Sequence, residues 1–418
     1  MVLENGVRIV GEEITNLRSV AIGIWIATGS RYETPQNNGI SHFLEHMFFK
    51  GTDKYTAKEL AQVFDGLGGQ VNAFTSKEYT CFYARVLDEH FQVAIDTLAD
   101  MLFHSRFPEE EIEKEKKVVI EEIGMYEDTP DELVMDLLSA GVYGNHPLGY
   151  TILGQEANLQ SFLREDLTGY IQDHYTPSNM VVSVAGNVRQ SEVVKLATAL
   201  FGNASGAMKA CEKDVMTPPF HEAISVREKD IEQVHLTLAW AGLSMHDERL
   251  YALVLMNNCL GNTSSSRLFQ DIREERGMAY SVFSYHSSYV DCGMFGVYAA
   301  TSPEHLDEVA ERIDVICKEM AKFGMSEDEL QKAKEQVKGS MMLSLESTSS
   351  RMSRLGKNEL MLLREVTADE SLSLINTVTR EDVLQVAQAI LTDRVAVSAV
   401  GPVGESEFSR FSRSRVLH

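Results

Sequence analysis

The sequence predicts an α+β fold made of two homologous repeats of about 200 residues, each a mostly antiparallel sheet packed with helices. Three observations lead to this prediction. The 418 residues exceed what a single hydrophobic core usually serves, so two domains are expected. Short motifs recur in the same order at a nearly constant offset. Within each copy, strand patterns come first, helical patterns follow, and a strand closes the copy.

The repeat is visible at four places along the chain. VSVAGNV at 182–188 recurs as VSAVGPV at 397–403, and REDL at 164–167 recurs as REDV at 380–383. FPEEEIEKEK corresponds in the same way to MSEDELQKAK, and the only two tryptophans, Trp25 and Trp240, lie in similar apolar stretches. Four ordered matches at nearly equal spacing indicate duplication of one unit.

The domain division follows from this repeat. We expect one domain at residues 1–210 and a homologous domain at 211–418. The stretch 202–219 contains Gly, Ala, Ser and a Pro pair, a composition typical of a linker between domains.

The elements of the first copy can be predicted in chain order. Apolar or alternating residues predict strands at 7–10, 20–27, 70–74 and 79–86. Helices are predicted at 40–50, from a Thr56/Glu59 capping box to the glycines at 66–69, at 88–104, and from Pro108 to about 128, where Pro130 marks a stop.

Composition excludes several classes of function. The formal net charge of -24 argues against a nucleic-acid or anionic-membrane partner, because both require a basic surface, whereas basic substrates stay compatible. A soluble acidic surface explains the same charge without any role in binding. The five scattered cysteines lack C-x-x-C spacing and indicate reduced structural thiols. No apolar run is long enough to span a bilayer and no secretory signal is recognisable, so a cytoplasmic location is expected.

The chemistry centres on the motif His42-Phe-Leu-Glu45-His46 in the predicted helix 40–50. Positions i, i+3 and i+4 share one helix face, so two imidazoles and a carboxylate face the same small volume. Two imidazoles at this spacing can share one tetrahedral zinc, while Glu45 acts on water. The alternative is two partly buried histidines and a surface glutamate on an amphipathic helix. Apolar neighbours favour the metal site, because a buried polar triad without a ligand is unfavourable.

A catalytic zinc usually takes a third protein ligand. The acidic helix predicted after Pro108 is the candidate source, but spacing alone cannot choose among its glutamates. Its apolar residues mark a zone expected to be buried that brackets Glu121 and Glu122: Val118, Val119, Ile123 and Met125.

Three segments carry a resemblance to a known family. GISHFLEHMFFKGT, GGQVNAFTSKEYTCFYARV and EKEKKVVIEEIGMYEDTPDEL together resemble the family of pitrilysin, insulin-degrading enzyme and the mitochondrial processing peptidase, in its short two-domain bacterial type. In the second half, LGNTSSSRLFQDIREERGMAYSVFSYHSSYVDCGMFGVY resembles the partner-domain signature of that family. The resemblance therefore covers nearly the whole chain. It implies a zinc metalloendopeptidase of the HxxEH type with one zinc per chain, acting on peptides or unfolded segments.

The resemblance also implies a role for each site residue. His42, His46 and Glu122 correspond to zinc ligands, and Glu45 to the general base that acts with a zinc-activated water. Glu115 corresponds to a supporting carboxylate that orients the site, and the alternative for this residue is a solvated helix face. Further positions correspond to the pair that supports the oxyanion, Arg273 and Tyr280, and to the edge strand that pairs with the substrate, Asn72, Ala73, Phe74 and Thr75. Without the resemblance, Arg273 would be interpreted as a surface charge and Tyr280 as a core residue of a strand. The segment from Asn72 to Thr75 would be interpreted as an ordinary strand.

The second copy lacks the metal residues. At the repeat offset, the motif positions hold Asn257, Leu260 and Gly261, and Ala333 and Ser340 replace Glu115 and Glu122. We therefore expect a zinc-binding catalytic domain first and a substrate-closing domain second. Long family members carry four such units, so the resemblance implies a homodimer whose active site is completed in trans. The alternatives are a monomer that closes over its own zinc, and a non-catalytic peptide-binding or scaffold protein of the same fold.

Overall fold

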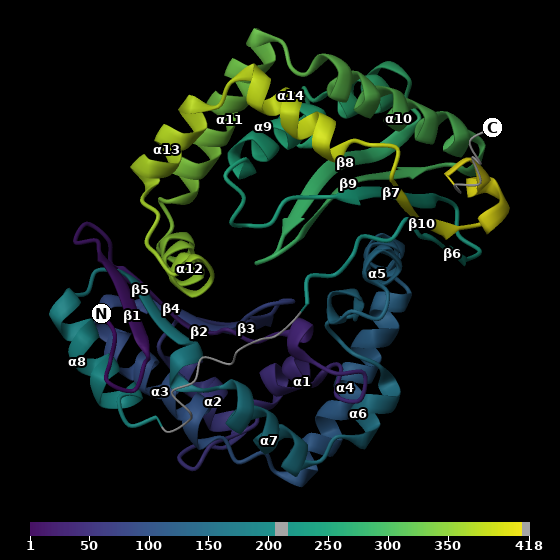
Figure 1. Ribbon diagram of the computed structural model, residues 1–418. Helices are drawn as coiled ribbons and strands as arrows, with labels where there is room; N and C mark the ends of the chain where they lie inside the picture. Colours follow the sequence, from purple (N-terminus) through teal and green to yellow (C-terminus); the bar gives the residue numbers. More distant parts are fainter. Residues whose placement is uncertain (205–215, 412–418) are drawn as a thin grey trace. The chain divides into compact units, whose positions relative to one another are not determined.

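The computed structural model describes residues 1–204 and 216–411, which form two compact units (Figure 1). Most of the N-terminal half belongs to the first unit and most of the C-terminal half to the second. Each unit also takes in one segment of the opposite half: Met342–Val366 belongs to the first unit, and Gly124–Gly149 to the second. The predicted boundary between residues 210 and 211 lies outside the described residues, so that division stays a prediction.

The first unit contains a five-stranded sheet of order β1-β5-β2-β4-β3. Its strands are β1 (Arg8–Glu13), β2 (Ser19–Ile26), β3 (Gln70–Thr75), β4 (Thr80–Leu87) and β5 (Met180–Gly186). Only β1 and β5 pair in parallel, and the other pairs are antiparallel. Within the sheet β3 pairs with β4 alone, so β3 is an edge strand.

The second unit repeats this topology with the sheet order β6-β10-β7-β9-β8. Its strands are β6 (Ile224–Glu228), β7 (Val234–Ala241), β8 (Ala279–Ser288), β9 (Gly293–Thr301) and β10 (Ala396–Gly401). Here β6 and β10 form the parallel pair. The predicted fold class, two repeats that each contain a mostly antiparallel sheet with helices, is confirmed.

The register of the strands corrects one match of the sequence repeat. Ile24 pairs with Val182 in the first sheet, and Leu238 pairs with Val397, the counterpart of Val182, in the second. Ile24 therefore corresponds to Leu238, so Trp25 corresponds to Ala239, which lies one residue before Trp240. Because successive side chains of a strand point to opposite faces, Trp25 and Trp240 lie on opposite faces of their sheets.

Helices from the same half of the chain cover one face of each sheet. In the first unit they are α1 (Ile40–Met47), α2 (Ala57–Gly66), α3 (Phe91–His104), α4 (Glu109–Glu127, whose last residues belong to the second unit), α6 (Glu156–Ser161), α7 (Arg164–His174) and α8 (Gln190–Phe201). In the second unit they are α9 (Leu250–Gly261), a π-helical segment η5 (Phe269–Glu275), α10 (Leu306–Phe323), α11 (Glu327–Ser344, whose last residues belong to the first unit), α13 (Ala368–Thr377) and α14 (Arg380–Ile390).

One helix from the opposite half of the chain covers the other face of each sheet. Helix α12 (Thr348–Lys357) lies against β2 and β5 of the first unit, as Figure 1 shows. It packs closely, because a Cβ at Gly356 would lie 2.0 Å from Nε1 of Trp25. Helix α5 (Pro130–Tyr143) lies against β10 and β7 of the second unit, where Leu138 and Val142 pack with Ala239.

Most predicted elements of the first copy agree with the structure to within a few residues. The Thr56/Glu59 capping box is present, since Oγ1 of Thr56 accepts a hydrogen bond from the Glu59 backbone N–H and the Glu59 carboxylate accepts one from the Thr56 N–H. Pro130 follows the end of α4, but it also occupies the first position of α5, where proline is well tolerated. No helix among the described residues is long and apolar enough to cross a membrane.

Candidate metal centre

Helix α1 carries the predicted metal motif and is fixed at its N-terminus by a carboxylate from the segment that precedes it. Gly39 precedes the helix with φ of 100°, a left-handed conformation that favours glycine, and it offers no side chain to cap the helix. The buried carboxylate of Glu33 accepts hydrogen bonds from the backbone N–H groups of Gly39 (2.8 Å) and Ser41 (2.9 Å) instead. Burial raises the pKa of Glu33 in spite of these bonds. The apolar side of α1 is buried in the core of the unit, so this packing and the Glu33 cap together hold the motif in place.

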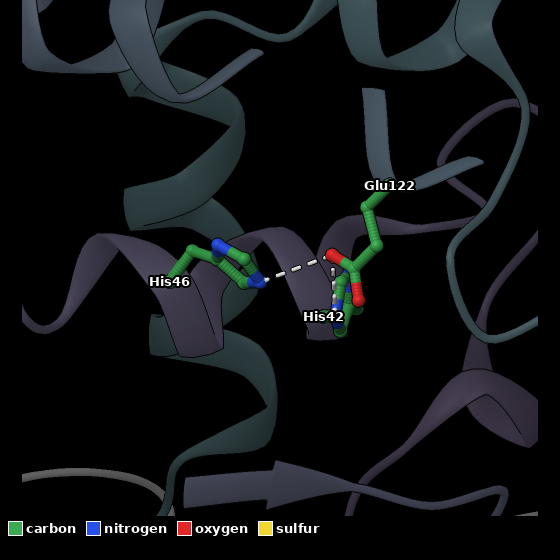
Figure 2. Close-up of side chains that lie close together, drawn as sticks. All are labelled: His42, His46 and Glu122. Atoms are coloured by element: carbon green, nitrogen blue, oxygen red, sulfur yellow. Dashed lines mark ion pairs between the residues drawn. The ribbon is translucent and has the colours of Figure 1, made fainter. Parts of the chain in front are cut away.

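Three predicted metal ligands lie together in the first unit. His42 and His46 lie one turn apart on α1, and Glu122 extends from α4 so that one carboxylate oxygen approaches both imidazoles (Figure 2). The Oε2 atom of Glu122 lies 3.7 Å from Nε2 of His42 and 3.5 Å from Nε2 of His46. One ligand atom from each residue lies within 4.8 Å of the other two.

The protonation state of His42 suits metal binding. The side chain is buried, and its Nδ1 atom has no hydrogen-bond partner among the described residues. Burial, together with the nearby His46, lowers the pKa of His42 to about 3. The imidazole is therefore neutral at physiological pH, as a metal ligand must be. Two imidazoles and one carboxylate form a donor set that fits a catalytic zinc and leaves one coordination position for water or substrate.

Glu115 lies behind His46 rather than among the ligands. Its Oε1 atom lies 2.8 Å from Nδ1 of His46, and its Oε2 atom lies 2.6 Å from Nζ of Lys50. A carboxylate only accepts, so Nδ1 of His46 carries the proton and Nε2 is left free to face Glu122. Burial raises the pKa of Glu115, but the hydrogen bonds from His46 and Lys50 outweigh burial and bring this pKa below its ordinary value.

Glu45 faces the same volume but is not one of the three clustered residues. The hydroxyl of Thr75 in β3 donates a hydrogen bond to Oε2 of Glu45 at 2.6 Å. Burial raises the pKa of Glu45, while the bond from Thr75 acts in the opposite direction. A partly buried carboxylate with a raised pKa, next to a metal site, is suited to accept and return protons near neutral pH.

The four residues predicted to bind substrate all lie in the edge strand β3. Asn72 is exposed, Ala73 is buried, and Phe74 is 37% exposed and contacts the ring of Trp25. Thr75 ends the strand at Glu45. The strand therefore leads directly to the carboxylate beside the metal residues.

Arg273 and Tyr280 belong to the second unit, whereas the metal residues belong to the first. The structure brings these two side chains together, because Cζ of Arg273 lies 4.7 Å from the ring centroid of Tyr280 and 4.6 Å from that of Phe269. Tyr280 is 78% exposed, so it is not the strand core residue that its pattern alone suggests. Its exposure leaves the phenol available to another molecule.

The second unit has no corresponding metal cluster among the described residues. Helix α9 contains no histidine or acidic residue. Packing also disfavours a side chain at Gly261, the position that corresponds to His46 in the repeat, since a Cβ there would lie 2.4 Å from the backbone nitrogen of Ser284. In α4 and α11 the register of the repeat is preserved, because Lys116 and Lys334 are both buried and both donate to a backbone carbonyl, that of Gln160 and that of Asn376.

Two residues at the site were missed by the sequence analysis: Glu33, which caps α1, and Lys50, which binds Glu115. Thr75 was predicted as part of the substrate strand, but its hydrogen bond to Glu45 was not. Lys50 lies four residues after His46 within the predicted helix 40–50, but α1 ends at Met47, so Lys50 follows the helix and helical spacing does not place it. Glu33 and Thr75 reach α1 from outside that helix, so no local spacing points to them.

Comparisons with known proteins agree along the chain. The model of a family described as insulinase (peptidase family M16) matches residues 8–156, and that of the peptidase M16 inactive domain matches residues 161–337. An uncharacterized zinc protease of Bacillus subtilis is 53% identical over 403 residues, which are 96% of this chain and 97% of that protein. An uncharacterized zinc protease of Streptomyces coelicolor is 40% identical over 419 residues, 98% of this chain and 90% of that protein.

Two solved structures share the fold. The crystal structure of a protease from Helicobacter pylori has a TM-score of 0.88 at 23% identity, with 96% of this chain and 98% of that chain covered. A structure described as the peptidase M16 inactive domain from Pseudomonas fluorescens has a TM-score of 0.89 at 21% identity, with 97% of both chains covered.

Proposed function

The chain belongs to the insulinase family, peptidase family M16, and we propose that it is a zinc-dependent endopeptidase that hydrolyses peptides or unfolded segments. The observation that carries this proposal is the cluster of His42, His46 and Glu122, with Glu45 beside it. The names of its relatives as zinc proteases support the choice of metal.

His42, His46 and Glu122 would hold one zinc ion per chain. Burial keeps His42 neutral, and Glu115 holds the proton of His46 on Nδ1, so both Nε2 atoms are available as ligands. Zinc supplies Lewis acidity in such a site, because it increases the acidity of water and polarises a carbonyl group. The protein contributes the fixed positions of the three ligands.

Glu45 is the proton carrier in this proposal. Its carboxylate takes a proton from the attacking water and returns the proton to the leaving amine. The hydrogen bond from Thr75 fixes the orientation of the carboxylate during both transfers. Because burial raises the pKa of Glu45, its carboxylate is a stronger base than that of an ordinary glutamate and takes the proton of the water more readily.

The peptide would bind as an additional strand along Asn72, Ala73, Phe74 and Thr75 of β3. An edge strand offers free backbone groups for such pairing, and β3 ends at Glu45. Arg273 and Tyr280 would donate to the oxyanion that develops as the peptide bond is attacked. Their mutual contact and the exposure of Tyr280 support a role toward substrate.

We further propose that the chain acts as a homodimer in the cytoplasm, in which Arg273 and Tyr280 of one chain serve the metal residues of its partner. In the long family members that the sequence resembles, the metal unit and the Arg/Tyr unit come from different halves. The membership of the two groups in separate compact units supports the same division here.

Metal analysis and peptide cleavage test the proposed function together. Purified protein should contain about one zinc per chain and cleave unfolded peptides; Glu45→Gln should keep zinc and lose turnover, whereas Glu122→Gln should lose zinc. A protein that binds peptides without cleaving them at any metal loading is a binding or scaffold protein instead. Zinc that is undiminished in a His42→Ala/Glu122→Gln double variant would show that the ligand assignment is wrong.

A further inference from the structure

The first unit contains a buried ion pair that the proposed chemistry does not use. Nη1 of Arg31 donates a hydrogen bond to Oε1 of Glu78 at 2.7 Å, and the two side chains are only 1% and 3% exposed. Arg31 lies in the short 3-10 helix η1 (Ser30–Tyr32), and Glu78 lies in the turn between β3 and β4. Desolvation of two buried charges offsets much of their attraction, so stability alone does not explain this pair.

The segment that carries Arg31 holds the turn after β3 in place. The backbone N–H of Arg31 donates to the carbonyl of Lys77 at 2.8 Å. At Gly29 the two segments approach so closely that a Cβ would clash with the carbonyl oxygen of Ser76. The turn begins directly after Thr75, whose hydroxyl donates to the proposed base at 2.6 Å. The position of this hydroxyl therefore depends on the turn.

The same segment also holds the helix that carries Glu45. Glu33 accepts hydrogen bonds from backbone N–H groups at the start of α1, among them that of Ser41. The buried hydroxyl of Tyr170 adds a second connection, because it lies 3.1 Å from the hydroxyl of Thr28 and 2.9 Å from that of Ser41. Glu45 lies one helical turn after Ser41. The segment is thus connected to both partners of the hydrogen bond at the proposed base.

The second unit has the same backbone contact with a methionine in place of the arginine. Because Ile24 corresponds to Leu238 in strand register, Arg31 corresponds to Met245, which likewise lies seven residues further on. The backbone N–H of Met245 donates to the carbonyl of Tyr289 at 2.8 Å, in the turn between β8 and β9. The shared fold therefore forms without a charge at this position, and the arginine occurs in the unit that carries the candidate metal ligands.

We propose that Arg31 and Glu78 are positioning residues for Glu45: their ion pair fixes the turn after β3, and this turn keeps the hydroxyl of Thr75 on the Glu45 carboxylate. The inference rests on the proposed peptidase function, in which Glu45 carries the proton. Because the pair acts through Thr75, its loss should lower turnover and leave zinc content and KM nearly unchanged.

The test removes both charges together. Arg31→Met/Glu78→Gln leaves no unpaired charge buried, and it introduces the residue that the second unit has at this position. We expect kcat to fall about tenfold, with KM within about twofold of the wild-type value and zinc content unchanged. Arg31→Lys keeps an ion pair and should retain kcat to within about threefold of wild type.

The control neutralises another ion pair of the same unit. Arg8→Met/Glu359→Gln acts at β1, the opposite edge strand of the sheet, and should leave kcat at the wild-type value. An unchanged kcat in Arg31→Met/Glu78→Gln, a loss confined to KM or to zinc content, or an equal loss in the control would overturn the proposal.

A double-mutant cycle tests whether the pair acts through Thr75. Thr75→Val already removes the hydrogen bond to Glu45. In that background, Arg31→Met/Glu78→Gln should therefore lower kcat by less than about threefold further, instead of about tenfold. The same factor in both backgrounds would show that the pair does not act through this hydroxyl and would overturn the proposal.

Amide hydrogen exchange, followed by mass spectrometry, gives a readout that does not require turnover. In Arg31→Met/Glu78→Gln, residues 75–80 should exchange at least about threefold faster, while α1 exchanges as in wild type. Unchanged exchange at 75–80 would contradict the inference. If wild-type protein cleaves no peptide, the peptidase proposal fails, and exchange at 75–80 still decides whether the pair fixes the turn. If urea unfolding shows that this variant does not fold, Glu78→Asp, which retracts the carboxylate and keeps its charge, takes its place in each comparison.

Discussion

At the scale of single residues, the two carboxylates that contact His46 differ in position. Glu122 approaches Nε2, the atom that faces the metal site, whereas Glu115 accepts the proton of Nδ1 on the other side of the ring. Lys50 neutralises Glu115, so the pair presents a hydrogen-bond acceptor to the imidazole without leaving an unpaired buried charge. A supporting carboxylate of this kind fixes the ring and raises its basicity.

Glu115→Gln should therefore weaken zinc binding without abolishing it. The amide can no longer pair with Lys50 as an ion, and it holds the Nδ1 proton of His46 less strongly. We expect zinc affinity to fall about 10- to 100-fold, as measured by competition with a chromophoric chelator. Glu113→Gln on the same helix, where the side chain points to solvent, is the control. Affinity that stays at the wild-type value would contradict the role of Glu115.

Thr75→Val tests the hydrogen bond to Glu45 while keeping the shape of the side chain. The Thr75 hydroxyl favours the ionised carboxylate, so its loss should raise the pKa of Glu45 further. A base must be ionised to act, hence the acidic limb of the kcat/KM profile should move to higher pH, and kcat should fall about tenfold. Thr75→Ser should restore both. Unchanged zinc content with an unshifted profile in Thr75→Val would show that the bond has no influence.

Sequence reasoning reached these residues to different degrees. Helical spacing alone brings His42, Glu45 and His46 to one face, since positions i, i+3 and i+4 neighbour each other. The choice of Glu122 needed the family resemblance, because several glutamates of α4 satisfy the same local pattern. Thr75 and Glu33 depend on how β3 and the segment before α1 pack, which no local pattern contains.

At the scale of elements, α11 is fixed by one acidic residue in its first turn. Glu329 binds Arg267 with both carboxylate oxygens, at 2.8 and 2.9 Å, and also accepts a hydrogen bond from the Ser326 backbone N–H. These bonds, that from Arg267 first, lower the pKa of Glu329 to about 2. Glu329 thus serves as a helix cap and as a tie between α11 and the segment that precedes η5.

Glu329→Gln should lower the free energy of unfolding by about 1–2 kcal/mol at pH 7, after allowance for partial solvent exposure. The folded-state pKa lies below the ordinary value of 4.5, so this stabilisation is complete above about pH 4.5. It is lost as the pH falls toward about 2, where the folded carboxyl takes up its proton. Urea unfolding of both proteins should therefore give a difference that narrows below about pH 4.5. A difference that is constant with pH, or as large in Glu335→Gln, would argue against the ion pair.

Helices α5 and α12 each pack on the sheet of the opposite half of the chain, and the sequence did not predict this arrangement. Amphipathic patterns predicted which residues of the first copy form helices, because one apolar stripe must be buried. The pattern does not say against which sheet that stripe packs. Gly356 beneath Trp25 shows the actual partner of α12, and this close approach becomes visible only in three dimensions.

At the scale of the whole molecule, the two units share one fold, but the candidate metal ligands and the Arg273/Tyr280 pair lie in different units. Both sheets have the same strand order with one parallel pair, and both long helices keep a buried lysine at the corresponding position. Only the first unit gathers metal ligands among the residues described, and the pair formed by the half-buried Arg273 and the exposed Tyr280 occurs in the second. The sequence repeat predicted this architecture because backbone topology constrains many positions at once, whereas the mispaired tryptophans show that a single match does not.

Because Glu45 and Arg273 lie in different units, the proposed dimer can be tested by mixing two chains that each lack one of these residues. A Glu45→Gln chain lacks the base, and an Arg273→Ala chain lacks the oxyanion donor, so each alone should be poorly active. In a mixed dimer that works in trans, the Arg273→Ala chain supplies metal and base while its partner supplies the arginine, and one complete site returns. Random exchange of equal amounts makes half of the dimers mixed, each with one complete site, so activity should recover to about one quarter of wild type.

Differently tagged chains establish that exchange has occurred, and wild-type protein taken through the same treatment gives the reference activity. A chain that closes over its own metal would keep one defect in every site, so mixing would leave activity at the level of the separate variants. Sedimentation analysis of wild-type protein decides between that monomer and a dimer that works in cis. Recovery near one quarter requires that Arg273 acts across the dimer, because no single chain in the mixture carries both Glu45 and Arg273.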